Sequence, residues 1–302
     1  MVTASAGDGA RPASAGRAPS AETGTAGSRS ADRGDAPLLR LRGIGKSFGP
    51  VRALAGIDLD IPAGQVTALV GDNGAGKSTL IKTISGIWQP TSGEMHWNGN
   101  PVELHGPRDA TDLGIATVYQ DLALCDNLDI VQNMLLGHEV RRHGLLDEVS
   151  MELTAKQTLA DLRVTTVRSI RQLVGSLSGG QRQSVAVAKA VMLDARLVVM
   201  DEPTAALGVT QTELVLSLIG RLSARGHAVL LVSHNLNEVF QVADRMAVLY
   251  LGQLAASGPA SDFDTQSAVE LMTTGKSGRL GGGHGSGTKS VSSGGRVSGT
   301  EG

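Results

Sequence analysis

Residues 71–79 constrain the fold of this chain more than any other segment. They read Gly71, Asp72, Asn73, Gly74, Ala75, Gly76, Lys77, Ser78 and Thr79. A predicted strand, residues 65–70, precedes them, and a predicted helix, residues 78–84, follows. Glycines let backbone N–H groups wrap around an anion, and the helix N-terminus adds unpaired donors and its positive dipole end. This G-x-x-x-x-G-K-[ST] pattern predicts a phosphate loop in which Lys77 reaches the β- and γ-phosphates and Ser78 places its hydroxyl on Mg²⁺.

A pair of carboxylates forms the second component of the predicted site. Residues 197–200 are an apolar stretch typical of a buried strand, and Asp201 and Glu202 follow it directly. Open α/β sheets bind ligands at the carboxyl ends of their strands. An acidic pair after a strand also begins many solvated loops, so its meaning depends on the phosphate loop beside it. We expect Asp201 to hold the Mg²⁺ shell and Glu202 to orient or deprotonate the attacking water.

The order of apolar segments predicts an α/β fold. Short apolar stretches separated by Gly and Pro turns fill residues 38–70, and residues 94–97, followed by Asn98-Gly99, look like one arm of a β-hairpin. These segments predict an antiparallel β subdomain. Farther along, over residues 197–232, strands alternate with a helix, which is typical of a parallel sheet covered on both faces. We therefore expect a phosphate-loop NTPase core with a mainly parallel sheet.

Helical spacing begins at about residue 121 and continues to residue 193, which predicts an inserted α-helical subdomain. The clearest helices in it are residues 151–162 and 181–193. A further amphipathic helix follows the carboxylate pair. Its predicted apolar face carries Leu214, Leu218 and Leu222.

Both ends of the chain have a composition that does not support a packed core. Residues 1–36 consist mainly of Ala, Gly, Ser, Pro, Arg and Asp, and Gly and Ser dominate residues 275–302. Such segments bury too little apolar surface to offset the entropy lost on ordering, so we expect both to be disordered tails. The remaining region, residues 37–274, has a normal size for one large domain.

Composition excludes several classes of function. The formal net charge of −2, from 27 Lys+Arg and 29 Asp+Glu, provides no basic excess to hold a nucleic acid or an anionic bilayer non-specifically. A single cysteine excludes an internal disulfide and a multi-cysteine metal cage. The apolar runs are too short to serve as a secretion signal or to span a bilayer. We expect a cytosolic protein that reaches a membrane by docking onto an integral partner.

A pentapeptide between the phosphate loop and the carboxylate pair carries a family resemblance. Residues 177–181 read Leu177, Ser178, Gly179, Gly180 and Gln181. A serine and two glycines at a helix start offer exposed N–H donors to an anion, although a capped helix after a turn has the same pattern. Following a phosphate loop, the segment matches the LSGGQ signature, and the chain resembles the ATP-binding subunits of ABC (ATP-binding cassette) transporters over about residues 38–273. The resemblance implies that Ser178 to Gln181 cover ATP held by a second protomer.

Three further positions fit the order of motifs in that family. Gln120, after the apolar segment 115–119, resembles the glutamine that senses Mg²⁺ and the reacting water. His234, after the apolar strand 229–232, resembles the switch histidine that contacts the γ-phosphate. Phe48 matches the aromatic residue that stacks on adenine, and a core role is the competing interpretation.

The resemblance is greatest to bacterial importers of monosaccharides of the fructose, ribose and xylose kind. It implies a subunit on the cytoplasmic face of the cell membrane that uses ATP and Mg²⁺ and has permease subunits and a substrate-binding protein as partners. Because this chain has one phosphate loop and one signature, the resemblance also implies a homodimer. Gly208 departs from the wider family, which often has Asp there for a contact across the dimer. An exporter ATPase and a nucleotide-sensing regulatory module are the alternatives.

Overall fold

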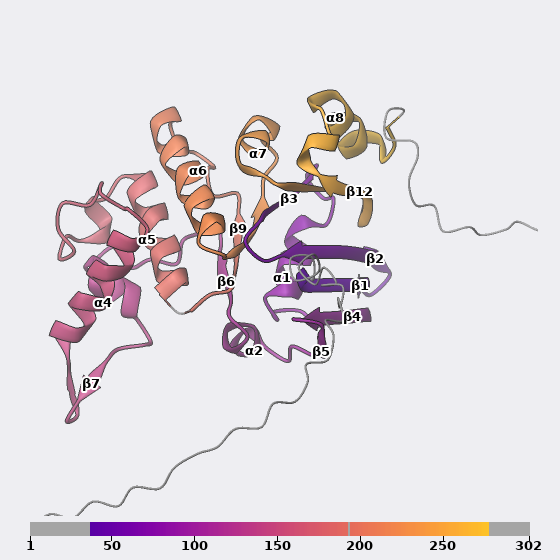
Figure 1. The fold of residues 1–302 in the computed structure, drawn as a ribbon. Helices are drawn as coiled ribbons and strands as arrows, with labels where there is room; N and C mark the ends of the chain where they lie inside the picture. Colours follow the sequence, from indigo (N-terminus) through magenta and orange to yellow (C-terminus); the bar gives the residue numbers. More distant parts are fainter. Residues whose placement is uncertain (1–36, 193, 278–302) are drawn as a thin grey trace, which may run out of the picture. The chain divides into compact units, whose positions relative to one another are not determined.

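The structure is a computed structural model that describes residues 37–192 and 194–277 (Figure 1). The expected tail 1–36, residue 193 and most of the expected tail 275–302 lie outside the described residues. A central six-stranded sheet has the order β12-β11-β3-β10-β9-β6. Its strands, in chain order, are β3 (Val66–Gly71), β6 (Ile115–Val118), β9 (Leu197–Asp201), β10 (Ala228–Val232), β11 (Arg245–Tyr250) and β12 (Gln253–Pro259).

Five strands of this sheet are parallel, and β12 pairs antiparallel with β11 at one edge. The phosphate loop therefore begins at the carboxyl end of β3, and Asp201 ends β9, two strands away across β10. Parallel strands bring their carboxyl ends to one edge of a sheet, and this is where both predicted components lie. The predicted α/β class with a mainly parallel sheet is confirmed.

A second, four-stranded sheet is antiparallel in the described residues, as expected from the strand segments before residue 63 and the hairpin that begins at 94, whereas residues 66–70 belong to β3 of the central sheet. Its order is β2-β1-β4-β5. The strands are β1 (Pro37–Phe48), β2 (Val51–Pro62), β4 (Ser92–Trp97) and β5 (Asn100–Val102).

Alternating side chains on the central sheet enter two different cores. Val198 and Met200 of β9 pack into a cluster with the helical part of the chain, whereas Leu197 and Val199 pack against the antiparallel sheet. This two-residue alternation is the pleat of a strand buried on both faces.

Eight α-helices are present in the described residues. They are α1 (Lys77–Ile84), α2 (Pro107–Asp112), α3 (Ile130–Leu135), α4 (Glu148–Asp161), α5 (Gly179–Met192), α6 (Val209–Ala224), α7 (Leu236–Val242) and α8 (Thr265–Thr274). Two short 3₁₀ turns are Val174–Ser176 and Ala260–Asp262. Figure 1 shows α4 and α5 grouped beside β6, with α6, α7 and α8 following one another along the central sheet.

The structure corrects some details of the helical prediction. Helix α4 begins at Glu148, three residues before the predicted start, because the side chain of Asp147 accepts a hydrogen bond from the N–H of Ser150 and caps it. A small hairpin, β7 (Arg141–Arg142) and β8 (Leu145–Leu146), interrupts the predicted helical region. In α6 the prediction that Leu214 is buried is wrong: this side chain is 38% exposed, while Val215 and Ile219 are buried with Leu218 and Leu222.

Among the described residues, no helix combines the length and the apolar character needed to cross a bilayer.

Candidate nucleotide site

The phosphate loop has the backbone that its glycines predict. Gly76 has φ 105°, and a Cβ built there would lie 2.9 Å from the carbonyl oxygen of Ala53. A Cβ on Gly71 would lie 2.5 Å from the carbonyl oxygen of Leu249. Any other residue at these positions would displace neighbouring backbone, so the close-packed turn requires glycine at both.

Lys77 is the first residue of α1, and its side chain is held within the loop. Its Nζ donates to the carbonyl oxygens of Gly71 at 2.7 Å and Asp72 at 3.1 Å. An ammonium group has three N–H donors, so these two bonds orient Lys77 and leave one donor for an anion.

Most of the predicted phosphate, metal and water-orienting residues line one open cavity of about 570 Å³, whereas Gly71, Ala75 and His234 are not part of its lining. From the loop and α1 these are Asp72, Asn73, Gly74, Gly76, Lys77, Ser78 and Thr79, and from beyond it Gln120, Asp201 and Glu202. Gln120 follows β6, Asp201 ends β9 and Glu202 follows it, so neighbouring parallel strands deliver all three side chains to the same place.

The carboxyl group of Asp201 is half-buried and lies among other charged groups. Burial raises the pKa of its carboxyl group, and the adjacent Glu202 raises it further, whereas Lys77 and Lys82 lower it. A carboxylate in such surroundings is stabilised by a nearby cation.

Glu202 and His234, both predicted to be catalytic, are in direct contact. Nδ1 of His234 lies 2.7 Å from Oε2 of Glu202, and the Glu202 side chain is 17% exposed while that of His234 is 67% exposed. The N–H of Glu202 donates to the carbonyl oxygen of Val232 at 2.9 Å, which joins β9 to the strand that precedes the histidine. This contact with His234 can orient Glu202, the proposed proton acceptor.

Phe48 lies beside the cavity rather than in its lining. It pairs across the β1–β2 hairpin with Val51, which does line the cavity. Its ring meets Trp88 edge-on with centroids 4.7 Å apart, and it is 41% exposed. This exposure contradicts the core interpretation of Phe48, and stacking on adenine stays a prediction.

The signature residues form an exposed start to helix α5. The side chain of Gln181 accepts from the N–H of Ser178 at 2.9 Å, and Ser178 Oγ accepts from the N–H of Gln181 at 3.4 Å. This reciprocal pair is a capping box, and Ser178 itself is exposed. None of Ser178 to Gln181 lines the cavity that contains Lys77.

The two signature glycines also have a packing role that the sequence did not reveal. A Cβ on Gly179 would lie 2.7 Å from Leu207, and one on Gly180 would lie 3.0 Å from Gln211. Gly208, between these two neighbours, precedes α6 as its N-cap and makes no side-chain cap. The predicted consequence of Gly208 for a contact between protomers stays a prediction.

Asn133 was not predicted from the sequence to have a role near the site. It is fully buried on α3, and its Nδ2 donates to the carbonyl oxygens of Cys125, Leu128 and Asp129 at 2.9, 3.2 and 3.0 Å. Its Oδ1 accepts from the N–H of Cys125 at 2.7 Å. One side chain thus pairs four backbone groups of the segment that follows Gln120.

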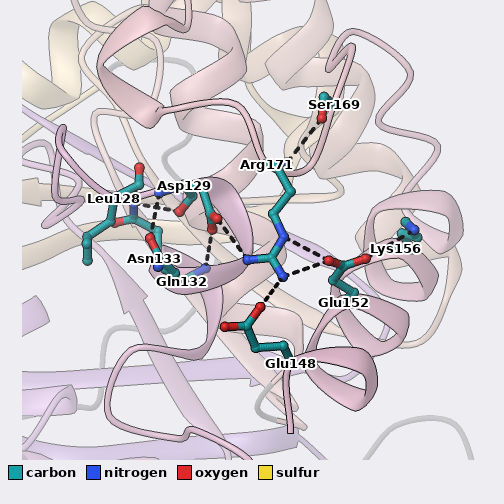
Figure 2. Close-up of polar contacts among 9 residues, drawn as sticks. All are labelled: Leu128, Asp129, Gln132, Asn133, Glu148, Glu152, Lys156, Ser169 and Arg171. Atoms are coloured by element: carbon teal, nitrogen blue, oxygen red, sulfur yellow. Dashed lines mark hydrogen bonds and ion pairs between the residues drawn. The ribbon is translucent and has the colours of Figure 1, made fainter. Parts of the chain in front are cut away.

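That segment is bonded to the backbone before the signature. The N–H groups of Val174 and Gly175 donate to the carbonyl oxygens of Leu128 and Asp126, each at 3.0 Å. Arg171 adds side-chain links: its guanidinium contacts Asp129 at 3.1 Å, Glu148 at 2.8 Å and Glu152 at 2.7 Å (Figure 2). Hydrogen bonds to these carboxylates raise the pKa of Arg171. The Gln120 and Ser178 segments are therefore joined within the helical part of the chain.

Replacing Asn133 with leucine is expected to lower the free energy of unfolding by about 2 to 4 kcal/mol, because buried backbone groups lose their partner. Urea denaturation followed by circular dichroism measures the loss. The matched control is the same substitution at the exposed Asn127, which is expected to change stability by no more than about 0.5 kcal/mol. Equal losses in both variants would contradict the role of Asn133.

Leu251 and Gly252 line the cavity without having been predicted. Gly252 accepts from the N–H of Ala55 at 2.7 Å and donates to the carbonyl oxygen of Ala75 at 2.9 Å, so the β11–β12 turn joins β2 to the phosphate loop. A glycine between two strands predicts a turn. The sequence near Gly252 does not predict its bonds to Ala55 and Ala75, because both are about two hundred residues away.

A parallel sheet, a phosphate loop at the end of β3 and carboxylates at the end of β9 define a nucleotide-binding protein of the phosphate-loop class. The chain also matches the family model for ABC transporters over residues 54–205. It belongs to the ABC transporter family and is an ATPase of that family.

Sequence relatives cover most of the chain. It is 44% identical over 247 residues to the fructose import ATP-binding protein FrcA of Rhizobium meliloti, covering 80% of this chain and 95% of that protein. It is 44% identical to the xylose/arabinose import ATP-binding protein XylG of Sulfolobus acidocaldarius, covering 78% and 94%. The ribose import ATP-binding protein RbsA 3 of Rubrobacter xylanophilus is 42% identical, and there the match spans 49% of the relative.

Solved structures of ATP-binding cassettes share the fold. The ADP conformation of MJ1267 superposes with a TM-score of 0.68 at 26% identity, covering 78% of this chain and 95% of that one. A dimeric post-hydrolysis state of MJ0796, bound to ADP and Pi, has a TM-score of 0.62 at 25% identity and covers 74% and 100%.

Proposed function

We propose that this chain hydrolyses ATP as the nucleotide-binding subunit of an importer, where two copies form the working unit and power uptake of a monosaccharide. One observation supports the dimer: Ser178 and Gly179, at the start of α5, are exposed and lie outside the cavity that contains Lys77, and a helix start is a place where an anion can bind. Each site would be completed by the signature of the other copy. The solved relative MJ0796, dimeric with ADP and Pi, supports this arrangement.

The residues of the cavity would divide the work of phosphoryl transfer. Lys77 and the loop N–H groups bind the phosphates. Glu202 orients the attacking water and accepts its proton, and His234 holds Glu202 in place through its contact with Oε2. Phe48 stacks on the base. Because this reaction depends mainly on positioning and charge stabilisation, closure of the dimer around the nucleotide would itself switch on hydrolysis.

Mg²⁺ fits the oxygen donors on the cavity wall. Ser78, Gln120 and Asp201 all line it and offer hydroxyl, amide and carboxylate oxygens, the ligands that hard cations prefer. The burial that raises the pKa of Asp201 is offset when a cation lies nearby. Bound there, the metal would neutralise phosphate charge.

A permease would dock beside Gln120. A cavity of about 260 Å³ is lined on one side by Tyr119, Leu122 and Ala123, which flank Gln120 in sequence, and on the other by Ala186 and Lys189 of α5. It therefore touches both the segment that senses nucleotide and the helix that follows the signature. A cytoplasmic helix of the permease in this groove would link transport to closure, and the subunit would lie peripherally on the cytoplasmic face of the membrane.

Uptake of a monosaccharide, with delivery by a substrate-binding protein, is proposed because relatives at 42–44% identity are named fructose, xylose/arabinose and ribose import proteins. The test reconstitutes the chain in vesicles with the permease and the substrate-binding protein of the same transporter. Labelled fructose, ribose and xylose are supplied on the binding-protein side, and ATP with Mg²⁺ on the other. ATP-dependent accumulation of one sugar, absent with ADP or EDTA, is expected. Outward movement would indicate an exporter, and ATP binding without phosphate release would indicate a regulatory module.

A further inference from the structure

The loop after β9 is held in an unusual conformation. Glu202 has φ 50° and Ala206 has φ 61°, values that residues with a Cβ rarely adopt. Such conformations persist only where the surroundings hold them. Thr204 lies between the two, is 8% exposed, and donates its hydroxyl hydrogen to Oε2 of Glu238 on helix α7. Glu238 therefore anchors the middle of the strained loop.

The same glutamate also holds the residue next to His234. Its other oxygen, Oε1, accepts from Nδ2 of Asn235 at 2.8 Å. The backbone N–H of Asn235 donates to Oγ of Ser233 at 3.0 Å, and Asn235 Oδ1 accepts from the N–H of Asn237 at 3.2 Å. These bonds fix the backbone on both sides of the histidine.

The contact between His234 and Glu202 closes a ring of residues. It runs from Glu202 along the chain to Thr204, through Glu238 to Asn235, and back through His234 to Glu202. The carboxylate of Glu238 accepts from Thr204 on one side of the ring and from Asn235 on the other. Within this ring, it joins α7 to the loop after β9. We infer that Glu238 is a positioning residue for ATP hydrolysis, whose two oxygens hold Glu202 and His234 in a single geometry.

Glu238 acts through its neighbours and not on the nucleotide. It lines a separate surface hollow with Leu207, Glu213 and Gln241, whereas Glu202 lines the cavity of the phosphate loop. Loss of Glu238 should therefore leave nucleotide binding intact and impair the alignment needed in the transition state. This inference rests on the proposed roles of Glu202 and His234.

The test measures steady-state ATP hydrolysis by the reconstituted transporter. Glu238→Ala is expected to lower kcat roughly tenfold to hundredfold, as misplacement of catalytic groups does, while KM for ATP stays within about twofold. Thr204→Val, which keeps the side-chain shape, should change kcat in the same direction. Glu238→Gln should restore most of the rate, because an amide can accept from Asn235 and donate to Thr204. Asn237→Ala, at an exposed position of α7, is the matched control and should behave as wild type.

The double variant Glu238→Ala, Thr204→Val separates a shared role from independent damage. If both residues act through one bond, the double variant is no slower than Glu238→Ala alone. Losses that multiply, or a wild-type kcat in Glu238→Ala, would overturn the inference. If Glu238→Ala does not fold, Thr204→Val decides: a wild-type kcat in that variant overturns the inference as well. A wild-type chain that does not hydrolyse ATP at all would instead overturn the proposed function.

Discussion

Replacing Lys77 with alanine is expected to reduce ATP hydrolysis by at least about a hundredfold, the loss seen when a fixed donor to developing charge is removed. Lys77 is 9% exposed and is oriented by the carbonyl groups of Gly71 and Asp72, so its ammonium group is held in place for the phosphates. The same change removes a charge that lowers the pKa of Asp201, and a less ionised Asp201 binds a cation more weakly. Phosphate release at saturating ATP and Mg²⁺ measures the loss.

Lys82→Ala is the matched control for this experiment. Lys82 is on the same helix, also lowers the pKa of Asp201, and stacks over the ring of Trp88 with Nζ 4.7 Å from the centroid. It does not line the cavity, so its loss should change the rate only modestly. Turnover in Lys77→Ala close to that of wild type would reject the assigned phosphate site. Equal losses in the two variants would assign the effect of Lys77 to charge near Asp201 and not to phosphate contact.

Glu202→Gln is expected to lower kcat by about 10² to 10⁴ while leaving ATP affinity unchanged. Glutamine has the size of glutamate and can still meet His234, but it does not accept a proton from water. Hydrolysis normally releases the closed dimer, so this variant should accumulate as an ATP-bound dimer. Single-turnover phosphate release measures the first effect, and light scattering with and without ATP measures the second.

Glu103→Gln provides the control for this substitution, because the Glu103 side chain is 90% exposed and lies outside the cavity. It should hydrolyse ATP as wild type does and dimerise no more than wild type. Hydrolysis at the wild-type rate in Glu202→Gln would remove Glu202 from its proposed role. A variant that is inactive but remains monomeric with ATP would contradict the shared site formed by two copies.

Much of the fold was predictable because its signals are local. The strand, glycine turn and helix around Gly76 follow from residue spacing within a dozen positions, and so do the buried strands β9 and β10. Predictions erred where a neighbour decided the outcome. Leu214 has helical spacing with Leu218, yet the face of α6 that meets the core is centred on Val215, Leu218 and Ile219. The start of α4 depended on a cap at Asp147 that hydropathy does not register.

The sequence by itself determined the family and predicted which residues bear the chemistry, because the phosphate loop, the signature, Asp201 with Glu202, and His234 each lie in a short run that is recognisable from local spacing. Only the tertiary structure decided what holds them, namely Asn133, Gly252 and Glu238. Gly252 bonds to Ala55 and Ala75, and Glu238 bonds to Thr204, all of which are far away in sequence. The partners of Asn133 are near it in sequence, but they come within reach only because of the way the chain turns before α3. A hydrogen bond depends on separation and angle in space, and the spacing of residue types along the chain encodes neither.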